Sequence, residues 1–277
     1  MHILSKRPSI NTQDGDGVKI RRVADFNFLA LDPFLMIDEL KSDDEQDYIG
    51  GFPPHPHRGI ETFTYILKGG FEHQDQMGNK KAIKAGDVQW MSTGFGVVHS
   101  EMPLADANEG MHGFQIWLNM PASEKLRPAQ YQDSTEKPVA EYNLPQGKVR
   151  VLAGEFQLHG QHCVGNLNGL AGNGAIADLQ LQANVMVSLD AQQEGFLGAY
   201  IYKGSVWGAK EGEFVILNAE QVNTLETNND GAGILLFKGQ PIKEKIAHMG
   251  PFVMNTQEEL QQAVRDYQSG KFGELTL

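Results

Sequence analysis

Two pairs of potential metal ligands occur in the first half of the sequence. His55 and His57 are separated by one residue in the segment HPHRG, and His99 and Glu101 have the same spacing in HSEMP. Residues i and i+2 of a β-strand project from one face and lie about 6.5–7 Å apart along it. If the two pairs lie on neighbouring strands, three imidazoles and one carboxylate can converge on a first-row transition metal and leave positions for water or a substrate. The spacing therefore predicts a metal site.

A second carboxylate competes with Glu101. Glu61 has the same odd parity as His55 and His57, so uninterrupted alternation would direct its side chain toward the same face. It could bind the metal, orient a ligand from behind or act as a base. The spacing alone does not choose between Glu61 and Glu101.

The other histidines have weaker patterns. We expect His73 to be exposed, because it leads into a hairpin turn, whereas His112 could support a ligand from behind. His159 and His162 have a helix-like spacing in a sequence that is otherwise β-like, and we do not expect them to bind metal. Cys163 is the only cysteine, so no intramolecular disulfide can form, and we expect it to be a small buried residue.

Short apolar segments, separated by many of the 31 glycines and 12 prolines, predict the strands that position these residues. The segments are 61–67, 114–118, 148–152, 185–189, 199–202, 214–217 and 233–237. Many short strands with regular turns are typical of a β-sandwich or barrel. We therefore predict an all-β fold.

One helix is predicted near the C-terminal end. Thr256 and Glu259 have the spacing of a capping box, and an apolar stripe with helical spacing follows from Leu260 to Tyr267. Gly270 then favours the end of the helix. We interpret the stripe as a packing face and not as a binding site.

An internal repeat indicates two copies of one unit. TYILKGG at 64–70 resembles AYIYKGS at 199–205, and AGDVQWM at 85–91 resembles EGEFVIL at 211–217. The segment 121–147, rich in Pro, Glu, Lys and Gln, is the expected connection. We predict a metal-binding barrel over residues 1–130 and a second barrel over residues 131–277 that includes the terminal helix.

Composition restricts the partners. The formal net charge is −12, which argues against direct binding of nucleic acid. No apolar segment has the length of a signal peptide or of a membrane span, so we expect a cytoplasmic protein without membrane contact. The acidic segment SDDEQD at 42–47 leaves open a basic protein partner.

These features resemble the cupin superfamily and, within it, the pirin family. The segments that carry the resemblance are LDPFLMIDE (31–39), HPHRGIETFTYILKG (55–69), HQDQMGN (73–79), GDVQWMSTGFGVVHSE (86–101), FQIWLNMP (114–121) and PFVMNTQEELQQAVRDYQSGKFG (251–273). The resemblance implies two tandem double-stranded β-helix barrels packed face to face, with one metal, usually iron, in the N-terminal barrel.

The resemblance also implies the ligand set. It places the metal on His55, His57, His99 and Glu101, and so favours Glu101 over Glu61. Because broader cupin motifs have a glutamate at the position of Glu61, this residue stays a candidate for support of the ligands or for the base. The same set also accepts Ni, Cu, Mn, Co or Zn in place of Fe(II).

The second copy departs from a metal-binding cupin. Alignment of the repeats places Asp190 and Gln192 at the positions of the first histidine pair, and Leu225 and Thr227 at those of His99 and Glu101. No ligand set survives, so we expect the second barrel to be structural.

The functions known for the family give two hypotheses. Some pirins are quercetin 2,3-dioxygenases, which open the flavonol ring with O₂ and release CO, so a flavonol or similar enol is the expected substrate and Glu101, followed by Glu61, the expected base. Phe52, Phe63 and Tyr65 could form the apolar walls, although each is more typical of barrel core. Other pirins regulate transcription or bind a metabolic enzyme, so a metal-containing regulatory protein without turnover is the alternative.

Arg58 has no role that its spacing assigns. It could steer an anion toward the site or brace Glu61.

Overall fold

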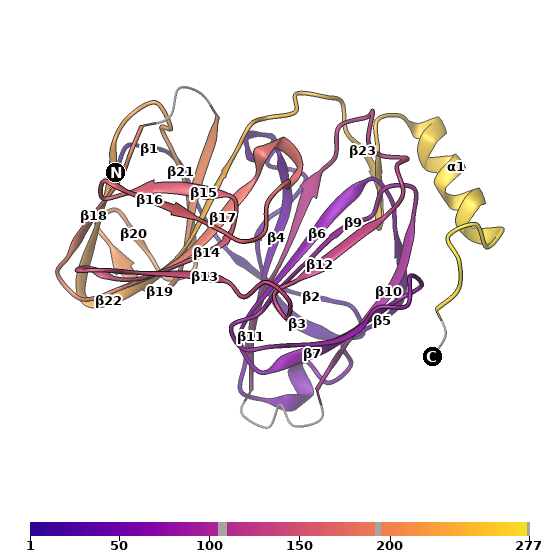
Figure 1. The fold of residues 1–277 in the computed structure, drawn as a ribbon, viewed down its shortest axis with the longest axis horizontal. Helices are drawn as coiled ribbons and strands as arrows, with labels where there is room; N and C mark the ends of the chain where they lie inside the picture. Colours follow the sequence, from indigo (N-terminus) through magenta and orange to yellow (C-terminus); the bar gives the residue numbers. More distant parts are fainter. Residues whose placement is uncertain (105–109, 192–194, 276–277) are drawn as a thin grey trace. The chain divides into compact units, whose positions relative to one another are not determined.

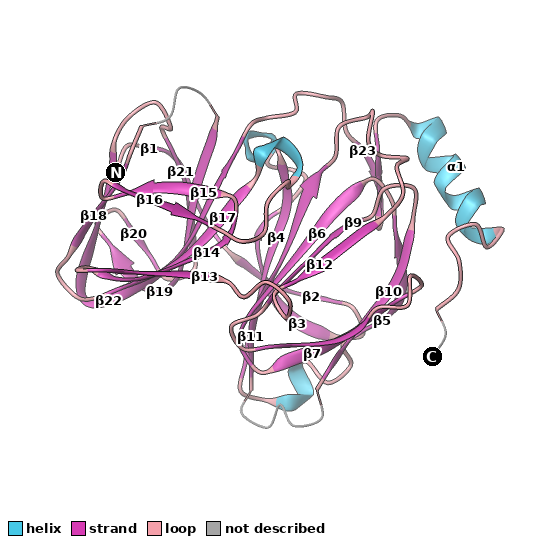
Figure 2. Ribbon diagram, in the orientation of Figure 1, coloured by secondary structure: helices cyan, strands magenta, loops and turns pink. Residues whose placement is uncertain are grey.

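The computed structural model describes residues 1–104, 110–191 and 195–275, and most of them lie in β-strands (Figure 2). The chain forms two compact units. The first barrel comprises Asn11–Arg22, Phe34–Thr135 and Ile242–Leu277. The second barrel comprises Met1–Ile10, Val23–Pro33 and Glu136–Pro241. The prediction of an all-β protein with two barrels and one terminal helix is confirmed.

The two units are not the continuous ranges that the repeat predicts. The boundary near residue 135 is close to the expected one. However, the N-terminal residues 1–10 belong to the second barrel, and the C-terminal residues 242–277 belong to the first. β1 (Ile3–Pro8) pairs with β21 (Glu213–Leu217) of the second barrel, and α1 (Gln257–Gln268) packs in the first barrel. The assignment of the terminal helix to the second barrel is therefore wrong. A repeat identifies matching strands, but it does not indicate where the flanking segments bury their apolar faces.

Two antiparallel sheets build the first barrel (Figure 1). The larger sheet has the order β12-β9-β6-β11-β4-β3-β2, with bounds Gln130–Asp133, Val88–Ser92, Ile60–Lys68, Met111–Asn119, Phe34–Ser42, Val18–Ala24 and Ile10–Asp14. The smaller sheet has the order β5-β10-β7-β8, with bounds Phe52–His57, Val97–Pro103, Gly70–Asp75 and Lys80–Lys84. A hairpin of β23 (Ala247–Met249) and β24 (Phe252–Met254) precedes α1.

One sheet wraps the second barrel. Its main path is β1-β21-β19-β22-β17-β14-β13, and β15, β16, β18 and β20 branch from it. The bounds not yet given are β13 Ala140–Leu144, β14 Gly147–Ala153, β15 Glu155–Leu158, β16 Gln161–Val164, β17 Ala175–Leu181, β18 Met186–Leu189, β19 Phe196–Val206, β20 Ala209–Lys210 and β22 Asn223–Gly239. The long β22 pairs with β18 through its first half and with β17 and β19 through its second half. Each of the seven predicted strands overlaps an observed one.

The terminal helix has the predicted start. The Thr256 hydroxyl accepts a hydrogen bond from the Glu259 amide, and the Glu259 carboxylate accepts one from the Thr256 amide, which satisfies two N–H groups that a helix start leaves unpaired. Leu260 and Ala263 are buried in an apolar cluster that also contains Val98 of β10. The stripe is thus a packing face, as predicted.

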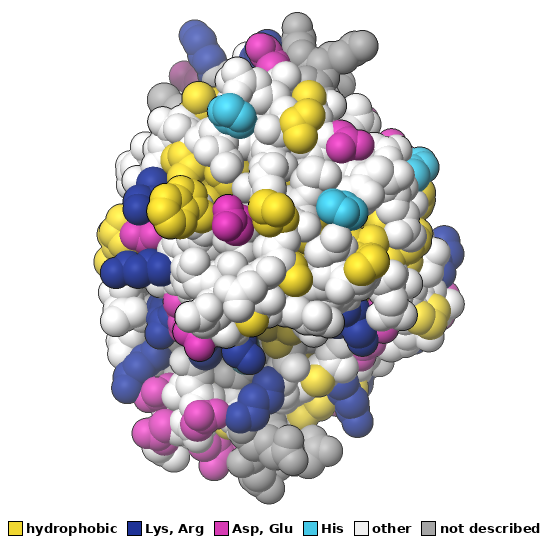
Figure 3. Space-filling model, turned by 90° about the vertical axis from the view of Figure 1, so that its left-hand side faces the viewer, with side chains coloured by type: hydrophobic (Ala, Val, Ile, Leu, Met, Phe, Trp, Pro, Cys, Tyr) yellow, Lys and Arg dark blue, Asp and Glu magenta, His cyan; other side chains and the backbone are white. Residues whose placement is uncertain are grey.

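Charged side chains of both signs mix on the surface. On the face shown in Figure 3, acidic, basic and apolar side chains are interspersed. Within the acidic segment 42–47, Asp43 pairs with Lys68 at 2.7 Å and Asp47 with Lys19 at 2.6 Å. Among the described helices, none is long and apolar enough to span a membrane.

Candidate metal centre

Strand register places the potential ligands on one face of the smaller sheet. β10 lies between β5 and β7, with His99 opposite His55 on one side and opposite Asp75 on the other. Glu101 lies opposite His73. Directly opposed residues of an antiparallel pair project from the same face. Neighbouring strands therefore carry His55, His99 and Glu101 on one face together with His73 and Asp75, and His57 shares this face through its i, i+2 spacing from His55.

Three imidazoles converge there. The potential ligand atoms of His55, His57 and His99 lie within 4.8 Å of one another, and His99 also forms such a group with His73 and Glu101. His99 is 1% exposed, and neither of its ring nitrogens has a hydrogen-bond partner among the described residues. Buried polar atoms of this kind are rare in native proteins. A bound cation would satisfy the ring nitrogen of His99 that carries the lone pair, so the donor set fits a metal.

Backbone carbonyls fix the orientation of two rings. Nδ1 of His55 lies 2.8 Å from the Pro53 carbonyl, and Nδ1 of His57 lies 3.3 Å from the Pro251 carbonyl. A carbonyl only accepts, so each Nδ1 carries the hydrogen and donates it, which leaves Nε2 available as a ligand.

The electrostatics keep two of the histidines neutral. Burial, followed by the nearby charge of His55, holds the pKa of His57 well below its ordinary value. Burial, with the charges of His55, His57 and His73, has the same effect on the pKa of His99. Metals bind the neutral imidazole, so these shifts favour metal binding near neutral pH.

The larger sheet contributes a hydrogen bond to Glu101. The Thr64 hydroxyl, on β6, donates to Oε1 of Glu101 at 3.1 Å and lies 2.8 Å from Oε1 of Gln115. Glu101 is 5% exposed, and its carboxylate is held beside the histidines. Because Thr64 faces the site, the even-numbered residues of β6 face it and the odd-numbered ones do not.

Glu61 lies on the opposite face of β6, so the expectation that it points toward the histidines is wrong. Its Oε2 accepts a hydrogen bond from Trp90 Nε1 at 3.1 Å, and its Oε1 lies 3.5 Å from a guanidinium nitrogen of Arg127. Gly59, with φ of +78°, separates β5 from β6 and breaks the alternation. Parity counted across this glycine therefore does not hold.

Phe52, Phe63 and Tyr65 do not form walls of the site and belong to the barrel core, the interpretation that the sequence favours for them. Phe63 and Tyr65 share the face of Glu61, and Phe52 packs with Phe71 in a separate apolar cluster. Two other aromatic rings contact the site instead. Trp117 makes an edge contact with His57 at 5.0 Å between ring centroids, and Tyr131 stacks on His73 at 5.1 Å. Both are partly exposed, as is His55.

The expectation that His73 is exposed is wrong. This residue is fully buried, and its Nε2 donates to Asp75 Oδ2 at 3.1 Å while its Nδ1 accepts from Gln89 Nε2 at 2.9 Å. Because both nitrogens are used, His73 supports the site from behind in this arrangement. The signal was present in the sequence: His73 and Asp75 have the same i, i+2 spacing as the two ligand pairs.

The remaining histidines lie apart from the ligand groups. His112 hydrogen-bonds Glu39 at 2.8 Å, on the face of β11 that carries Phe114, so the support expected from it is not observed. His162 is exposed and pairs with Glu155, while Cys163 is buried as predicted. His159 is exposed in a turn next to β15, with φ of +50°.

Arg58 neither faces the site as an anion guide nor contacts Glu61 in the described structure. Its guanidinium pairs with Asp266 of α1 at 3.0 Å. Both expectations for this residue are therefore wrong.

Comparison with known proteins identifies the family of the chain. A family model described as Pirin matches residues 17–118, and one described as the Pirin C-terminal cupin domain matches residues 176–273. The chain belongs to the pirin family. It is 45% identical over 270 residues to a candidate quercetin 2,3-dioxygenase of Vibrio cholerae, covering 96% of this chain and 95% of that protein. A pirin-like protein of Caulobacter vibrioides is 37% identical, with 94% and 95% covered.

The fold also matches a solved structure. The crystal structure of a quercetin 2,3-dioxygenase from Acinetobacter baumannii has a TM-score of 0.88 to this pirin, with 29% identity and 99% of both chains covered. The similarity extends over both barrels.

The second barrel of this pirin has an apolar interior at the corresponding place. Where β5 and β10 pair His55 with His99, β18 and β22 pair Val187 with Leu225, and both are fully buried in an apolar cluster. The Thr227 hydroxyl serves the backbone, since it donates to the Gln182 carbonyl at 2.7 Å.

The strand register places Val187, and not Asp190, opposite Leu225, so the alignment of Asp190 with His55 is wrong. Asp190 follows β18, where its amide donates to the Gln157 carbonyl, and Gln192 lies outside the described residues.

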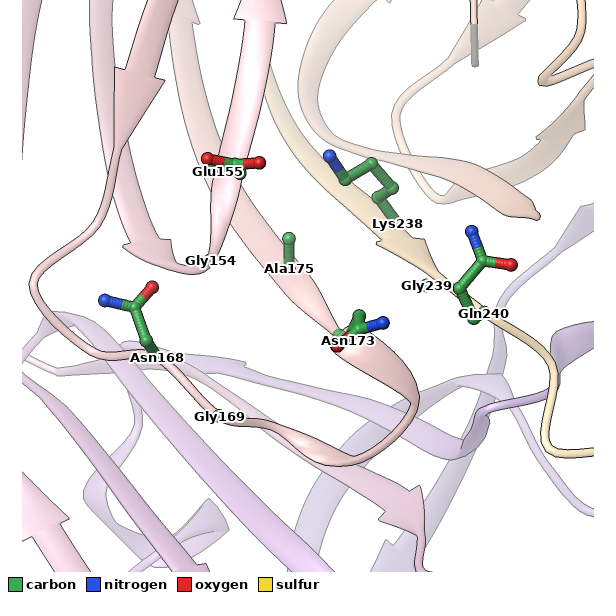
Figure 4. Close-up of a pocket in the computed structure, with 10 residues that line it drawn as sticks. Gly154, Glu155, Asn168, Gly169, Asn173, Ala175, Lys238, Gly239 and Gln240 are labelled. Carbon is green, nitrogen blue, oxygen red and sulfur yellow. The ribbon is translucent and has the colours of Figure 1, made fainter. Parts of the chain in front are cut away.

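A cavity of about 400 Å³ also lies in the second barrel (Figure 4). Its side chains are carboxylate, amide and ammonium groups, including Glu155, Asn168 and Lys238. Among the described residues that line it there is no histidine or cysteine, so they do not provide a metal-ligand set like that of the first barrel.

Proposed function

We propose that this pirin is a metal-dependent dioxygenase of the quercetin 2,3-dioxygenase type, which opens a flavonol or a similar enol with O₂ and releases CO. The observation that carries the proposal is the convergence of His55, His57 and His99 beside the buried carboxylate of Glu101. The similarity to quercetin 2,3-dioxygenases over nearly the whole chain supports it.

His55, His57, His99 and Glu101 would hold one divalent transition metal. Fe(II) is our first choice, and Ni, Cu, Mn, Co and Zn suit the same nitrogen and oxygen donors. When bound, such an ion supplies Lewis acidity at an oxygen of the substrate and open positions for small ligands.

Glu101 is our choice for the base. Its carboxylate is buried and is oriented by the Thr64 hydroxyl, so it can accept the proton of an enol hydroxyl without first losing a large water shell. His73, held by Asp75 and Gln89, packs behind His99 with ring centroids 5.4 Å apart and limits its movement. This arrangement keeps the reacting groups in place before the substrate enters.

The walls suit a flat substrate. The partly exposed rings of Trp117 and Tyr131 contact two of the histidines and offer π-faces or edges on which an aromatic enol can pack. We therefore expect aromatic enols to be better substrates than aliphatic ones of the same acidity.

The test combines two measurements on one sample. Protein prepared without chelator is assayed for transition metals and then for O₂ uptake and CO release with flavonols. Absence of a bound transition metal would contradict the metal centre. A loaded protein that turns over no flavonol or similar enol beyond the rate of free metal would contradict the dioxygenase.

The chain offers a matched control for the base. Glu101→Gln should lower turnover by about 100-fold or more, the usual effect of removing a general base. Glu61→Gln makes the same chemical change on the other face of β6 and should keep activity. Equal losses in the two variants would contradict the role of Glu101.

The regulatory alternative has less support. It depends on the acidic segment 42–47 as a surface for a basic partner, yet Asp43 and Asp47 are already paired with lysines of the same chain. A pull-down that recovers the same proteins with metal-loaded and metal-free protein would count against it further.

A further inference from the structure

A buried ion pair connects the metal-bearing strand to the terminal helix. Arg58, directly after His57, is 1% exposed, and its Nη1 donates to Oδ2 of Asp266 at 3.0 Å. Its Nε donates to the Phe95 carbonyl, and its guanidinium lies over the rings of Phe95 and Phe272 at 4.3 and 4.7 Å. Arginine forms such stacked, directional contacts through its planar group, which a flexible ammonium does not reproduce.

Residues 247–272, which we call the C-terminal clamp, also contact the same strand through the backbone. The Val253 amide donates to the Arg58 carbonyl at 3.0 Å, and Phe252 forms a parallel bridge with Arg58. One residue earlier, the Pro251 carbonyl lies 3.3 Å from Nδ1 of His57. The clamp thus supplies the group that orients a ligand histidine, and such groups tune metal affinity.

Two glycines make this close approach possible. A Cβ on Gly59 would lie 2.1 Å from the Val253 carbonyl oxygen, and one on Gly96 would lie 2.6 Å from the Phe272 ring. The buried Lys125 ammonium connects Gly59 to the clamp, since it donates to the carbonyls of Gly59 and Val253 at 2.7 and 3.0 Å. Both the turn after β5 and the clamp therefore contribute residues to this contact.

We propose that the C-terminal clamp is part of the metal centre, and that the buried Arg58–Asp266 pair acts as its positioning device by holding β5 so that His57 keeps its orientation. The inference rests on the proposed metal site and deepens it. It explains why an arginine and a glycine follow the histidines in HPHRG: the histidines face the metal, and Arg58 and Gly59 contact the clamp.

Metal affinity of the full chain tests the inference. Metal-free protein is titrated with Co(II) against a chromophoric chelator, and the visible spectrum of the Co(II) complex reports ligand geometry. Asp266→Asn keeps the shape of the side chain but removes its charge, and should weaken Co(II) binding by about tenfold with an altered spectrum. Arg58→Lys keeps the charge but loses the stacking, and should fall between Asp266→Asn and the unmodified protein.

Two controls separate positioning from general stability. Lys68→Ala breaks the exposed Lys68–Asp43 pair, which lies outside the clamp, so Co(II) affinity should stay within about twofold of the unmodified protein. Ile20→Ala weakens the apolar cluster under β3, away from the clamp, so it should lower the Tm while Co(II) affinity is kept.

The outcomes are distinguishable. Unchanged affinity and spectrum in Asp266→Asn would overturn the inference, and so would an equal loss of affinity in Ile20→Ala at an equal loss of Tm. If Asp266→Asn does not fold, Arg58→Lys carries the same comparison. Failure of the unmodified protein to bind Co(II) would overturn the metal centre itself.

Discussion

Each barrel contains an antiparallel strand pair at the corresponding place, but the residues that the two pairs bring together differ in chemistry. In the first, β5 and β10 bring His55 against His99, and the neighbouring β7 adds His73 and Asp75. In the second, β18 and β22 bring Val187 against Leu225 within a large apolar cluster. The strand framework alone therefore does not make a site, because the residues at one pair of facing positions decide what the interior does.

The difference also has an energetic side. A fully buried leucine stabilises a fold by about 1.5–3 kcal/mol. A buried polar group without a partner costs about 1–3 kcal/mol, and His99 has two such nitrogens among the described contacts. We infer that the first barrel gives up stability for its ligand set, whereas the second does not.

The largest expected effect is the loss of metal in His57→Ala. Removing one of three converging nitrogens should weaken metal binding by more than about 100-fold, since even changes behind the ligands cost 10–100-fold. Elemental analysis of chelator-free preparations measures it. His159→Ala changes an exposed histidine of the second barrel and should leave the metal content unchanged. Equal metal content in His57→Ala and the unmodified protein would remove the distinction between the barrels.

The second prediction concerns the apolar interior. Leu225→Ala leaves a cavity in the second barrel and should cost about 2–5 kcal/mol of its unfolding free energy. Calorimetry on the metal-free protein measures the loss, and elemental analysis should find the metal content of the folded variant unchanged. If Leu225→Ala folds and still unfolds cooperatively but no longer holds metal, the second barrel takes part in the chemistry.

Sequence reasoning went furthest where the signal is local. The i, i+2 spacing of His55/His57 and His99/Glu101 follows from strand geometry, and the structure places these residues on adjacent strands as expected. The capping box of α1 likewise depends only on residues three apart. The choice of pirin fold and ligand set came from resemblance, and the structure supplies the register that a resemblance does not contain.

The errors occur where long-range contacts decide. Parity assigned Glu61 to the site, but one glycine with positive φ at position 59 reversed the facing of β6. The local pattern around His73 favours an exposed hairpin, but the residue is buried and hydrogen-bonds Asp75 and Gln89. The partner of Arg58 lies 208 residues away, at Asp266, and no local pattern predicts that contact.

The third prediction concerns how the stability of the first barrel depends on acid pH. The hydrogen bond from Lys271 lowers the pKa of Asp266 most. Burial raises this pKa, whereas the hydrogen bonds from Gln262 and Arg58 lower it further. The net result is a pKa of about 2. In the unfolded chain this pKa is about 3.9. The folded state therefore binds fewer protons between these values, and its stabilisation is present above about pH 4 and is lost as the pH falls toward 2.

Metal-free Asp266→Asn should thus lose the pH dependence that this carboxylate contributes. At pH 6 we expect the free energy of unfolding of Asp266→Asn to be about 1–2 kcal/mol lower than that of the unmodified protein, and this difference should shrink toward pH 2. The difference is small because the partner Lys271 is solvent-exposed. Calorimetry between pH 6 and pH 2 measures it, and the change should be confined to the transition of the first barrel. If the difference in unfolding free energy between the two proteins stays constant from pH 6 to pH 2, the charge of Asp266 is not the cause of that difference.

The smallest and most diagnostic effect is expected for His99→Leu, which places the residue of the second barrel at the same position of the first. Metal binding should be lost, but the metal-free variant should be as stable as the metal-free parent or more stable by about 1 kcal/mol, because two unpartnered nitrogens are replaced by an apolar side chain. Urea unfolding of both metal-free proteins measures the difference. A metal-free variant that is less stable by more than about 1 kcal/mol would mean that the ring of His99 contributes to the fold itself. In that case the polar interior of the first barrel would not be a cost carried for the metal alone, and the two barrels would differ less than their residues suggest.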